Sequence, residues 1–180
     1  MPRTSFAGAF ALWYCGRIDL TSTMARTQSA GVVVYRRKGP DPEVLLVHPG
    51  GPFWAGKDDG AWSIPKGEFG ADETPADAAR RELFEETGCE PGNALIALTP
   101  VAQSRGKIVH AFAVEGDLDP AAIISNTFAL EWPPRSGRMQ SYPEVDRAAW
   151  FSLDDARRKI VPGQRAILDE LAARLRLDAK

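Results

Sequence analysis

The segment from Thr74 to Thr87, TPADAARRELFEET, and the Gly88 that follows it contain the signals that begin and end an α-helix. Thr74 suits the N-cap, Pro75 suits the first helical position, and Asp77 completes a capping-box pattern. Glycine commonly ends a helix because it adopts the left-handed backbone conformation without steric cost. We therefore predict a helix from Thr74 to Thr87, and any fold of this chain must accommodate it.

The predicted helix places three glutamates on one face. Glu82, Glu85 and Glu86 stand at positions i, i+3 and i+4, so their carboxylates converge. Like charges at this spacing cost about 0.2 to 0.5 kcal/mol per pair on an exposed helix, and a divalent cation would remove that cost. Ligand sets made only of oxygen favour Mg²⁺ or Mn²⁺. A solvated acidic face, paired with Arg80 and Arg81, is the alternative interpretation.

A second stripe of the same helix is apolar. Ala76, Ala79 and Leu83 lie beside the acidic face and are predicted to pack on a sheet. The acidic face would then not be needed to bury the helix, and it would be free for another role.

The remaining elements are predicted from hydrophobic patterning. The β-branched and aliphatic segments 29–37 and 43–49 form a strand pair joined by the turn sequence KGPDP, and further strands are predicted in 93–104, 107–116, 127–132 and 147–153. Apolar residues at helical spacing predict a closing helix over about 163–175. Strands between two separated helices indicate a mixed sheet with helices on both faces, an α/β (α+β) fold.

Length and charge limit the organisation of the chain. With 180 residues, 44% of them hydrophobic, it is most simply one domain, predicted over 24–180, with 1–23 as a poorly ordered N-terminal extension. The net charge of -2 offers no general attraction to nucleic acid or to an anionic membrane. Cys15 and Cys89 match no metal or redox spacing, which fits a cytoplasmic protein. His48 and His110 have no ligand partners nearby in sequence and are predicted to be structural.

Seven residues around the predicted helix stand at a characteristic spacing, and the segment resembles the Nudix box throughout its length. The matching residues are Gly67, Glu73, Arg81, Glu82, Glu85, Glu86 and Gly88. The one departure is Cys89, where that family usually has an aliphatic residue, and a buried cysteine behaves as a small hydrophobe. The resemblance extends more loosely over about 29–175.

The resemblance implies an α/β/α sandwich with a loop-helix-loop catalytic box. It also implies a metal-dependent hydrolase of nucleoside diphosphate-linked substrates that uses Mg²⁺ or Mn²⁺. The implied metal ligands are the carboxylates of Glu82, Glu85 and Glu86 and the carbonyl of Gly67, and Glu73 and Arg81 are implied to orient them.

The general base is left open by the sequence. A carboxylate of the metal cluster can deprotonate a metal-bound water, so Glu86, ranked first, and Glu85 are candidates. Some members of the family use a carboxylate outside the box, and Glu131 or Glu144 could serve in that way.

Substrate contacts are predicted outside the helix. Lys66 precedes Gly67 and is predicted to contact a substrate phosphate, whereas Arg135 and Arg138 lie in a turn-rich segment typical of a substrate loop. Four aromatic residues are candidates to stack on a base, although core packing is the more common role for each: Phe53, Trp54, Trp62 and Tyr142.

The predicted substrate is a small nucleotide, either a nucleoside triphosphate or a dinucleoside polyphosphate, because the loops at 48–62 and 131–138 resemble those of bacterial members of this kind. ADP-ribose or a nucleotide sugar is the alternative substrate. A non-catalytic, nucleotide-sensing Nudix module is the alternative of another class. A nucleic-acid substrate is disfavoured by the charge, and both a monomer and a homodimer are compatible with the sequence.

Overall fold

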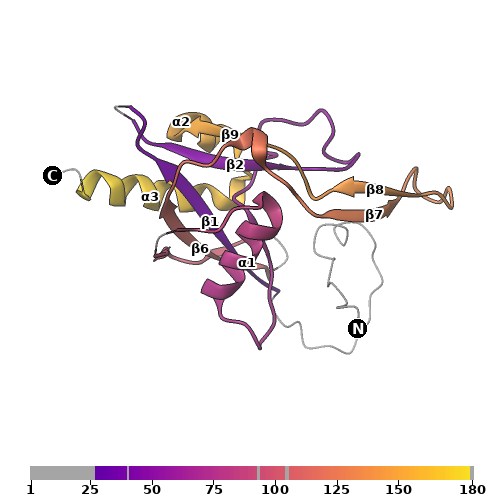
Figure 1. The fold of residues 1–180 in the computed structure, drawn as a ribbon, viewed down its shortest axis with the longest axis horizontal. Coiled ribbons are helices and arrows are strands. Elements are labelled where there is room, and N and C mark those ends of the chain that lie inside the picture. Colours follow the sequence, from indigo (N-terminus) through magenta and orange to yellow (C-terminus); the bar gives the residue numbers. More distant parts are fainter. Residues whose placement is uncertain (1–26, 40, 93, 104–105, 179–180) are drawn as a thin grey trace.

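The computed structural model describes residues 27–39, 41–92, 94–103 and 106–178, and the predicted extension 1–23 lies outside them. A mixed sheet of seven strands forms the centre of this part of the chain (Figure 1). Its strands are β1 (Gln28–Arg36), β2 (Glu43–Pro49), β3 (Lys66–Glu68), β4 (Ile96–Ala97), β5 (Val101–Ala102), β6 (Ile108–Glu115) and β9 (Val145–Ser152). The helices are α1 (Pro75–Thr87), α2 (Leu153–Lys159) and α3 (Arg165–Asp178), with 3-10 turns η3 (Pro120–Ala122) and η4 (Pro162–Gln164).

The strands follow the order β4-β6-β1-β2-β9 across the sheet, with β3 paired to β1 and β5 paired to β6. Strands β1 and β6 are parallel, whereas the pairs β1–β2, β2–β9 and β1–β3 are antiparallel. Gly67 lies opposite Ala30 in the β1–β3 pair. The start of the acidic box is therefore joined to the central strand of the sheet.

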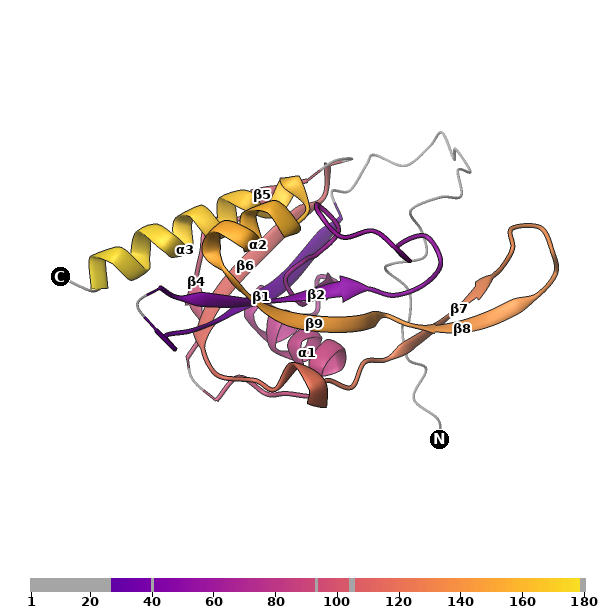
Figure 2. The same cartoon turned by 90° about the horizontal axis from the view of Figure 1, so that it is seen from above.

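Helices cover both faces of the sheet, as Figure 2 shows. Alternate residues of β1 point to opposite sides: Ala30, Val32 and Val34 pack toward α1, whereas Val33 and Tyr35 belong to the core under α2 and α3. These residues are almost completely buried, and burying each large apolar side chain contributes about 1.5 to 3 kcal/mol. The arrangement confirms the predicted α/β/α sandwich with a mixed sheet.

Helix α1 begins and ends where the sequence predicts. The Thr74 hydroxyl accepts a hydrogen bond from the Asp77 backbone N–H (3.2 Å) and donates one to the Asp77 carboxylate (2.7 Å). Gly88 has a φ of 73°, and its N–H bonds to the carbonyl of Phe84 (2.7 Å). Because only glycine adopts this φ without strain, Gly88 fixes the end of the helix.

The buried face of α1 differs from the predicted one. Ala79 and Leu83 are buried as expected, but Ala78 is buried in place of the half-buried Ala76, and Glu82 and Glu86 are buried too. The prediction that the acidic face lies apart from the packed face is therefore wrong for two of the three carboxylates. The helix approaches β3 closely enough for its acidic side chains to meet the strand backbone.

Several elements of the structure differ from the predicted ones. The segment 93–104 forms the short strands β4 and β5 instead of one strand, with Pro100 between them, and proline cannot donate to a strand ladder. The strand over 147–153 ends at Ser152, whose hydroxyl accepts from the Asp155 N–H (3.2 Å) and begins the unpredicted helix α2. Strand β3 was not predicted either.

A separate two-stranded hairpin extends from the sheet (Figures 1 and 2). It consists of β7 (Thr127–Glu131), which matches a predicted strand, and β8 (Met139–Pro143), which was not predicted. The Phe53 and Trp132 rings pack edge to face with centroids 5.1 Å apart, which joins the hairpin to the 50–60 loop. Among the described residues, no helix is both long enough and apolar enough to cross a membrane.

Candidate active site

The Gly67 backbone lies directly against the acidic face of α1. A Cβ atom on Gly67 would fall 2.0 Å from Cδ of Glu82, so the Glu82 carboxylate occupies the space that any side chain would need. In the preceding peptide, the Lys66 N–H donates to Oε2 of Glu86 (3.1 Å). Two glutamates one turn apart on α1 are therefore held against two successive residues of β3.

Burial changes the ionisation of these side chains. Glu82 is 9% exposed and Glu86 is 2% exposed. Burial raises the pKa of Glu82 to about 7 against the opposing effect of Arg81, and burial also raises the pKa of Glu86 well above its usual range. Burial lowers the pKa of Lys66, although the charges of Glu86 and Glu82 oppose that change. A cation bound here would favour the ionised carboxylates that burial disfavours.

Arg81 joins three carboxylates at the outer edge of the cluster. Its guanidinium donates to both carboxylate oxygens of Glu73 (2.9 and 2.8 Å), to Glu82 (2.5 Å) and to Glu85 (3.1 Å), and also to the Glu68 carbonyl (3.3 Å). The pKa of Arg81 is raised, chiefly by its hydrogen bonds to Glu73. The charge of Arg81 thus offsets part of the repulsion within the helix face.

A fourth carboxylate faces this cluster from outside the box. Burial, followed by the charge of Glu85, raises the pKa of Glu144, and Glu144 also acts on Glu86. Glu131, the other candidate from the sequence, lies on the hairpin and accepts a hydrogen bond from the Gly137 N–H (2.7 Å). Folding therefore brings Glu144, from the turn before β9, to the charged face of α1.

The donor atoms in this cluster fit a hard divalent cation. Within the described part of the chain, no three acidic, histidine or cysteine side chains already stand in a metal-binding arrangement, and Arg81 holds Glu82 and Glu85. The available donors are nonetheless all oxygen: the carboxylates of Glu82, Glu85 and Glu86 and the Gly67 carbonyl. Mg²⁺ and Mn²⁺ prefer such ligands, and the lack of a side chain on Gly67 leaves its backbone accessible to the carboxylates.

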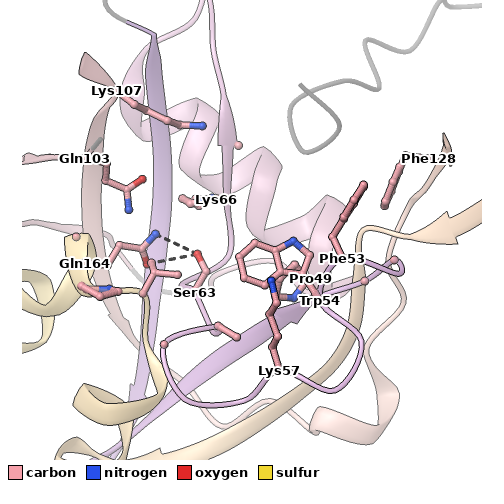
Figure 3. Close-up of a pocket in the computed structure, with 18 of the residues that line it drawn as sticks. Pro49, Phe53, Trp54, Lys57, Ser63, Lys66, Gln103, Lys107, Phe128 and Gln164 are labelled. Carbon is pink, nitrogen blue, oxygen red and sulfur yellow. Dashed lines mark hydrogen bonds between the residues drawn. The ribbon is translucent and has the colours of Figure 1, made fainter. Parts of the chain in front are cut away.

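A cavity of about 640 Å³ borders Lys66 and Gly67, and none of the residues that line it comes from α1. Among the described residues that line it, there are three lysines and no acidic side chain: Lys57, Lys66 and Lys107. Figure 3 shows Lys66 and Lys107 at one end and Lys57 beside Trp54. Such a lining is suited to an anionic ligand that also has an apolar part.

The aromatic candidates separate into two groups. Phe53 and Trp54, on the 50–60 loop, line the cavity together with Phe128 of β7, and the three lie across the cavity from Gln164 (Figure 3). Trp62 instead belongs to the core, where its ring packs against His48 and Phe151.

Tyr142 lies on β8 and is not among the residues that line the cavity, but its ring lies 6.1 Å from that of Phe128, which does. The Tyr142 hydroxyl donates to Gln140 (2.6 Å). The buried His48 bonds Asp146 (2.8 Å) through Nδ1 and the Lys57 carbonyl (2.9 Å) through Nε2, and so supports the loop.

Buried polar groups hold one wall of the cavity. Oε1 of Gln164 accepts the backbone N–H of Ile64 (3.1 Å), and its amide nitrogen donates to Oγ of Ser63 (3.1 Å). Gln164 is fully buried, and its bond to Ile64 pairs a buried backbone N–H that folding would otherwise leave without a partner. The segment that leads to Lys66 is thereby fixed to the turn η4 before α3.

Arg135 and Arg138 lie in the exposed turn between β7 and β8. Neither is among the residues that line the cavity, and Arg135 has a positive φ of 64°. Their proposed contact with substrate stays a prediction. Three other cavity residues were not singled out from the sequence: Lys107, Gln103 and Gln164. Their neighbours in sequence give no signal, because the cavity arises where distant segments meet.

The central sheet between two helical layers, with carboxylates gathered on α1 against β3, defines an α/β/α domain with a candidate metal centre. A family model for the NUDIX domain matches residues 25–171, most of the chain, and the protein therefore belongs to the NUDIX family. This assignment confirms the predicted resemblance and the predicted enzyme class, a hydrolase acting on phosphoric anhydride bonds.

Similarity extends to curated proteins and to a solved structure. The chain is 31% identical to an RNA pyrophosphohydrolase of Brucella anthropi, with 78% of this chain and 97% of that protein covered. It is 32% identical to an octanoyltransferase of Myxococcus xanthus over 87% of this chain, but spans only 40% of that protein. The Ap4A hydrolase of C. elegans, in a binary complex, has the same fold (TM-score 0.57, 22% identity, 82% of this chain and 97% of that chain covered).

Proposed function

We propose that the protein is a divalent-metal-dependent pyrophosphohydrolase of nucleoside triphosphates or dinucleoside polyphosphates. One observation carries the proposal: the carboxylate cluster of α1 and the lysine-lined cavity meet at the same peptide, Lys66–Gly67. A substrate with its base in the cavity would direct its phosphates toward this peptide. Its phosphoric anhydride would then reach the carboxylates.

Different residues of the chain would hold the metal ion, position its ligands and contact a phosphate. When bound, Mg²⁺ or Mn²⁺ would neutralise phosphate charge and acidify a water, and Glu82, Glu85, Glu86 and the Gly67 carbonyl would hold the ion. Arg81, fixed by Glu73, positions Glu82 and Glu85 through the hydrogen bonds described above. Lys66 adds a positive charge at the cavity wall, where it would contact a phosphate as a point charge.

Glu144 and Glu86 are the groups best placed to accept the proton of the attacking water. Glu86 receives the Lys66 N–H and is nearly fully buried, whereas Glu144 is half-buried and faces Glu85. Glu131 is engaged in the hairpin turn. We expect Glu144→Gln to lower turnover far more than Glu131→Gln, measured with the same nucleotide under saturating Mg²⁺. Equal loss in both variants would argue against Glu144.

A substrate panel tests the proposal directly. The protein would be incubated with ATP, GTP, diadenosine tetraphosphate, ADP-ribose and a nucleotide sugar, with Mg²⁺, with Mn²⁺ and with a chelator, and the products identified by chromatography. We expect cleavage of the triphosphates or the tetraphosphate only when metal is present, at least about tenfold more efficient than cleavage of ADP-ribose. Preferential cleavage of ADP-ribose would instead assign the protein to the nucleoside diphosphate derivatives as substrates. Metal binding without any cleavage would support a nucleotide-sensing role.

The 5′-triphosphate end of an RNA is the second candidate substrate. The observation that favours it is the similarity to the RNA pyrophosphohydrolase, which extends over nearly all of that protein. The exposed Arg135 and Arg138 would be available to an RNA chain leaving the cavity. Release of pyrophosphate from a 5′-triphosphorylated oligonucleotide, compared with release from free ATP under the same salt, decides between the two. Strong salt dependence for the oligonucleotide alone would favour RNA.

A further inference from the structure

The far end of the cavity carries a lysine that plays no part in the scheme above. Lys107 precedes β6 and lines the cavity beside Lys66 and Gln103. The Gln103 N–H donates to the Lys107 carbonyl (2.7 Å), so the backbone turns back on itself at this point. The Lys107 side chain is only 18% exposed. A long, flexible side chain is thus held at one place in the cavity wall.

The described residues that line this end of the cavity include Lys107 and Lys66 but no acidic side chain. The Lys107 ammonium lies 3.2 Å from Oε1 of Glu68, an exposed residue outside the cavity lining. Lys66, its neighbour in the lining, carries the same charge. Glu82 and Glu86 of α1 act on the charge of Lys66, but neither lines the cavity. An anion placed between the two lysines would relieve their repulsion, as a cation would for the carboxylates of α1.

We infer that Lys107 binds a phosphate beyond the cleaved anhydride and so selects substrates with a chain of three or more phosphates. The inference rests on the proposed function, because it places the cleaved bond at the Lys66–Gly67 peptide. A nucleoside triphosphate or a dinucleoside polyphosphate supplies the extra phosphate. ADP-ribose has two phosphates followed by a neutral ribose, which offers no charge to Lys107.

The variant Lys107→Gln removes the charge and keeps most of the side-chain length. One charge-assisted hydrogen bond is worth enough to lower kcat/KM for ATP and for diadenosine tetraphosphate about tenfold or more. For ADP-ribose we expect a change of less than about threefold. Equal losses with all three substrates, or no loss with any, would overturn the inference.

Two controls separate a specific effect from a general one. Glu68→Gln removes the Lys107–Glu68 ion pair but keeps the lysine charge, so the preference for three phosphates over two should remain. Lys38→Gln makes the same chemical change at an exposed lysine paired with Asp117, and it should not change kcat/KM for any of the three substrates. Loss of the preference in Glu68→Gln would mean that the ion pair, and not phosphate binding, accounts for the result.

Binding without catalysis keeps the inference testable if the proposed hydrolysis fails. Isothermal titration of the full chain with inorganic tripolyphosphate and with pyrophosphate, in a chelator, needs no metal and no cleavage. We expect tripolyphosphate to bind more tightly, and Lys107→Gln to remove most of that difference. Equal affinity of the unaltered protein for the two anions would overturn the inference, whatever the substrate panel shows.

Discussion

The acidic face of α1 and the lysine-lined cavity both border Lys66 and Gly67, but they are built in different ways. The three box glutamates come from five consecutive positions of one helix. The described residues that line the cavity come from five separate parts of the chain: 49–57, 60–67, Gln103 with Lys107, 128–130 and 161–164. A cluster made by one element is visible in local spacing, whereas a cavity made by five exists only after folding.

Both regions gather like charges, but their surroundings differ. Glu82 and Glu86 are buried against a strand, and Arg81 compensates part of the acidic charge. The lysines instead line a cavity that has no acidic side chain among its described lining residues. We therefore expect changes on the acidic side to affect the chemical step, and changes on the cavity side to affect affinity and substrate preference. The following predictions test that division, beginning with the largest effect.

Glu86→Gln should lower kcat by about a thousandfold, because the variant keeps the shape of the side chain but removes a charge required at the metal centre. The fold should persist, since removing a buried charge also removes its desolvation cost. Turnover of ATP and thermal unfolding of the metal-free protein would be measured together. Glu90→Gln, at an exposed residue just beyond α1, is the matched control. Activity near that of the unaltered protein in Glu86→Gln would exclude Glu86 from the centre.

Gly67→Ala should weaken Mn²⁺ binding by about 10- to 100-fold, because the added Cβ would occupy the position of the Glu82 carboxylate. Titration calorimetry with Mn²⁺ measures the effect. Gly39→Ala, where an added Cβ meets nothing within 4 Å, should bind Mn²⁺ as the unaltered protein does. Unchanged affinity in Gly67→Ala would show that the close contact between β3 and α1 is not needed for the metal.

Trp54→Leu should raise KM for a nucleotide about tenfold with little change in kcat, since stacking of a base on an aromatic ring is worth about 1 to 3 kcal/mol. Leucine keeps an apolar side chain where Trp54 packs on the core. Trp150→Leu, the same change at a half-buried tryptophan outside the cavity lining, serves as the control. A fall in kcat with unchanged KM would contradict the division between the two regions.

Arg135→Gln and Arg138→Gln should have the smallest effects, a loss of at most about fivefold in kcat/KM, because exposed charges contribute at most about 1 kcal/mol. The loss should shrink as salt is increased from low to physiological concentration. Kinetics with ATP and with a 5′-triphosphorylated oligonucleotide would be compared. If kcat/KM is unchanged with both substrates, the turn between β7 and β8 is not part of the substrate site.

Much of the fold could be predicted because its signals are local. Strands β1 and β2 alternate between two buried faces, and α3 shows apolar residues at helical spacing. Strand β3 was missed because three residues are too few for a periodic signal, and β8 because its half-exposed polar sequence gives no clear alternation. The start of α2 was signalled by Ser152 and Asp155, but the preceding strand pattern obscured it.

The sequence by itself determined α1, with its caps at Thr74 and Gly88, and the seven residues of the box, because hydrogen bonds within one helical turn and spacing along one helix need no distant partner. Only the tertiary structure brought Glu144 and not Glu131 to the box, buried Glu82 and Glu86, and placed Lys107 beside Lys66. Those outcomes depend on how a helix approaches a strand and on how five segments meet. Such contacts are made across the sheet, between residues that local spacing does not relate.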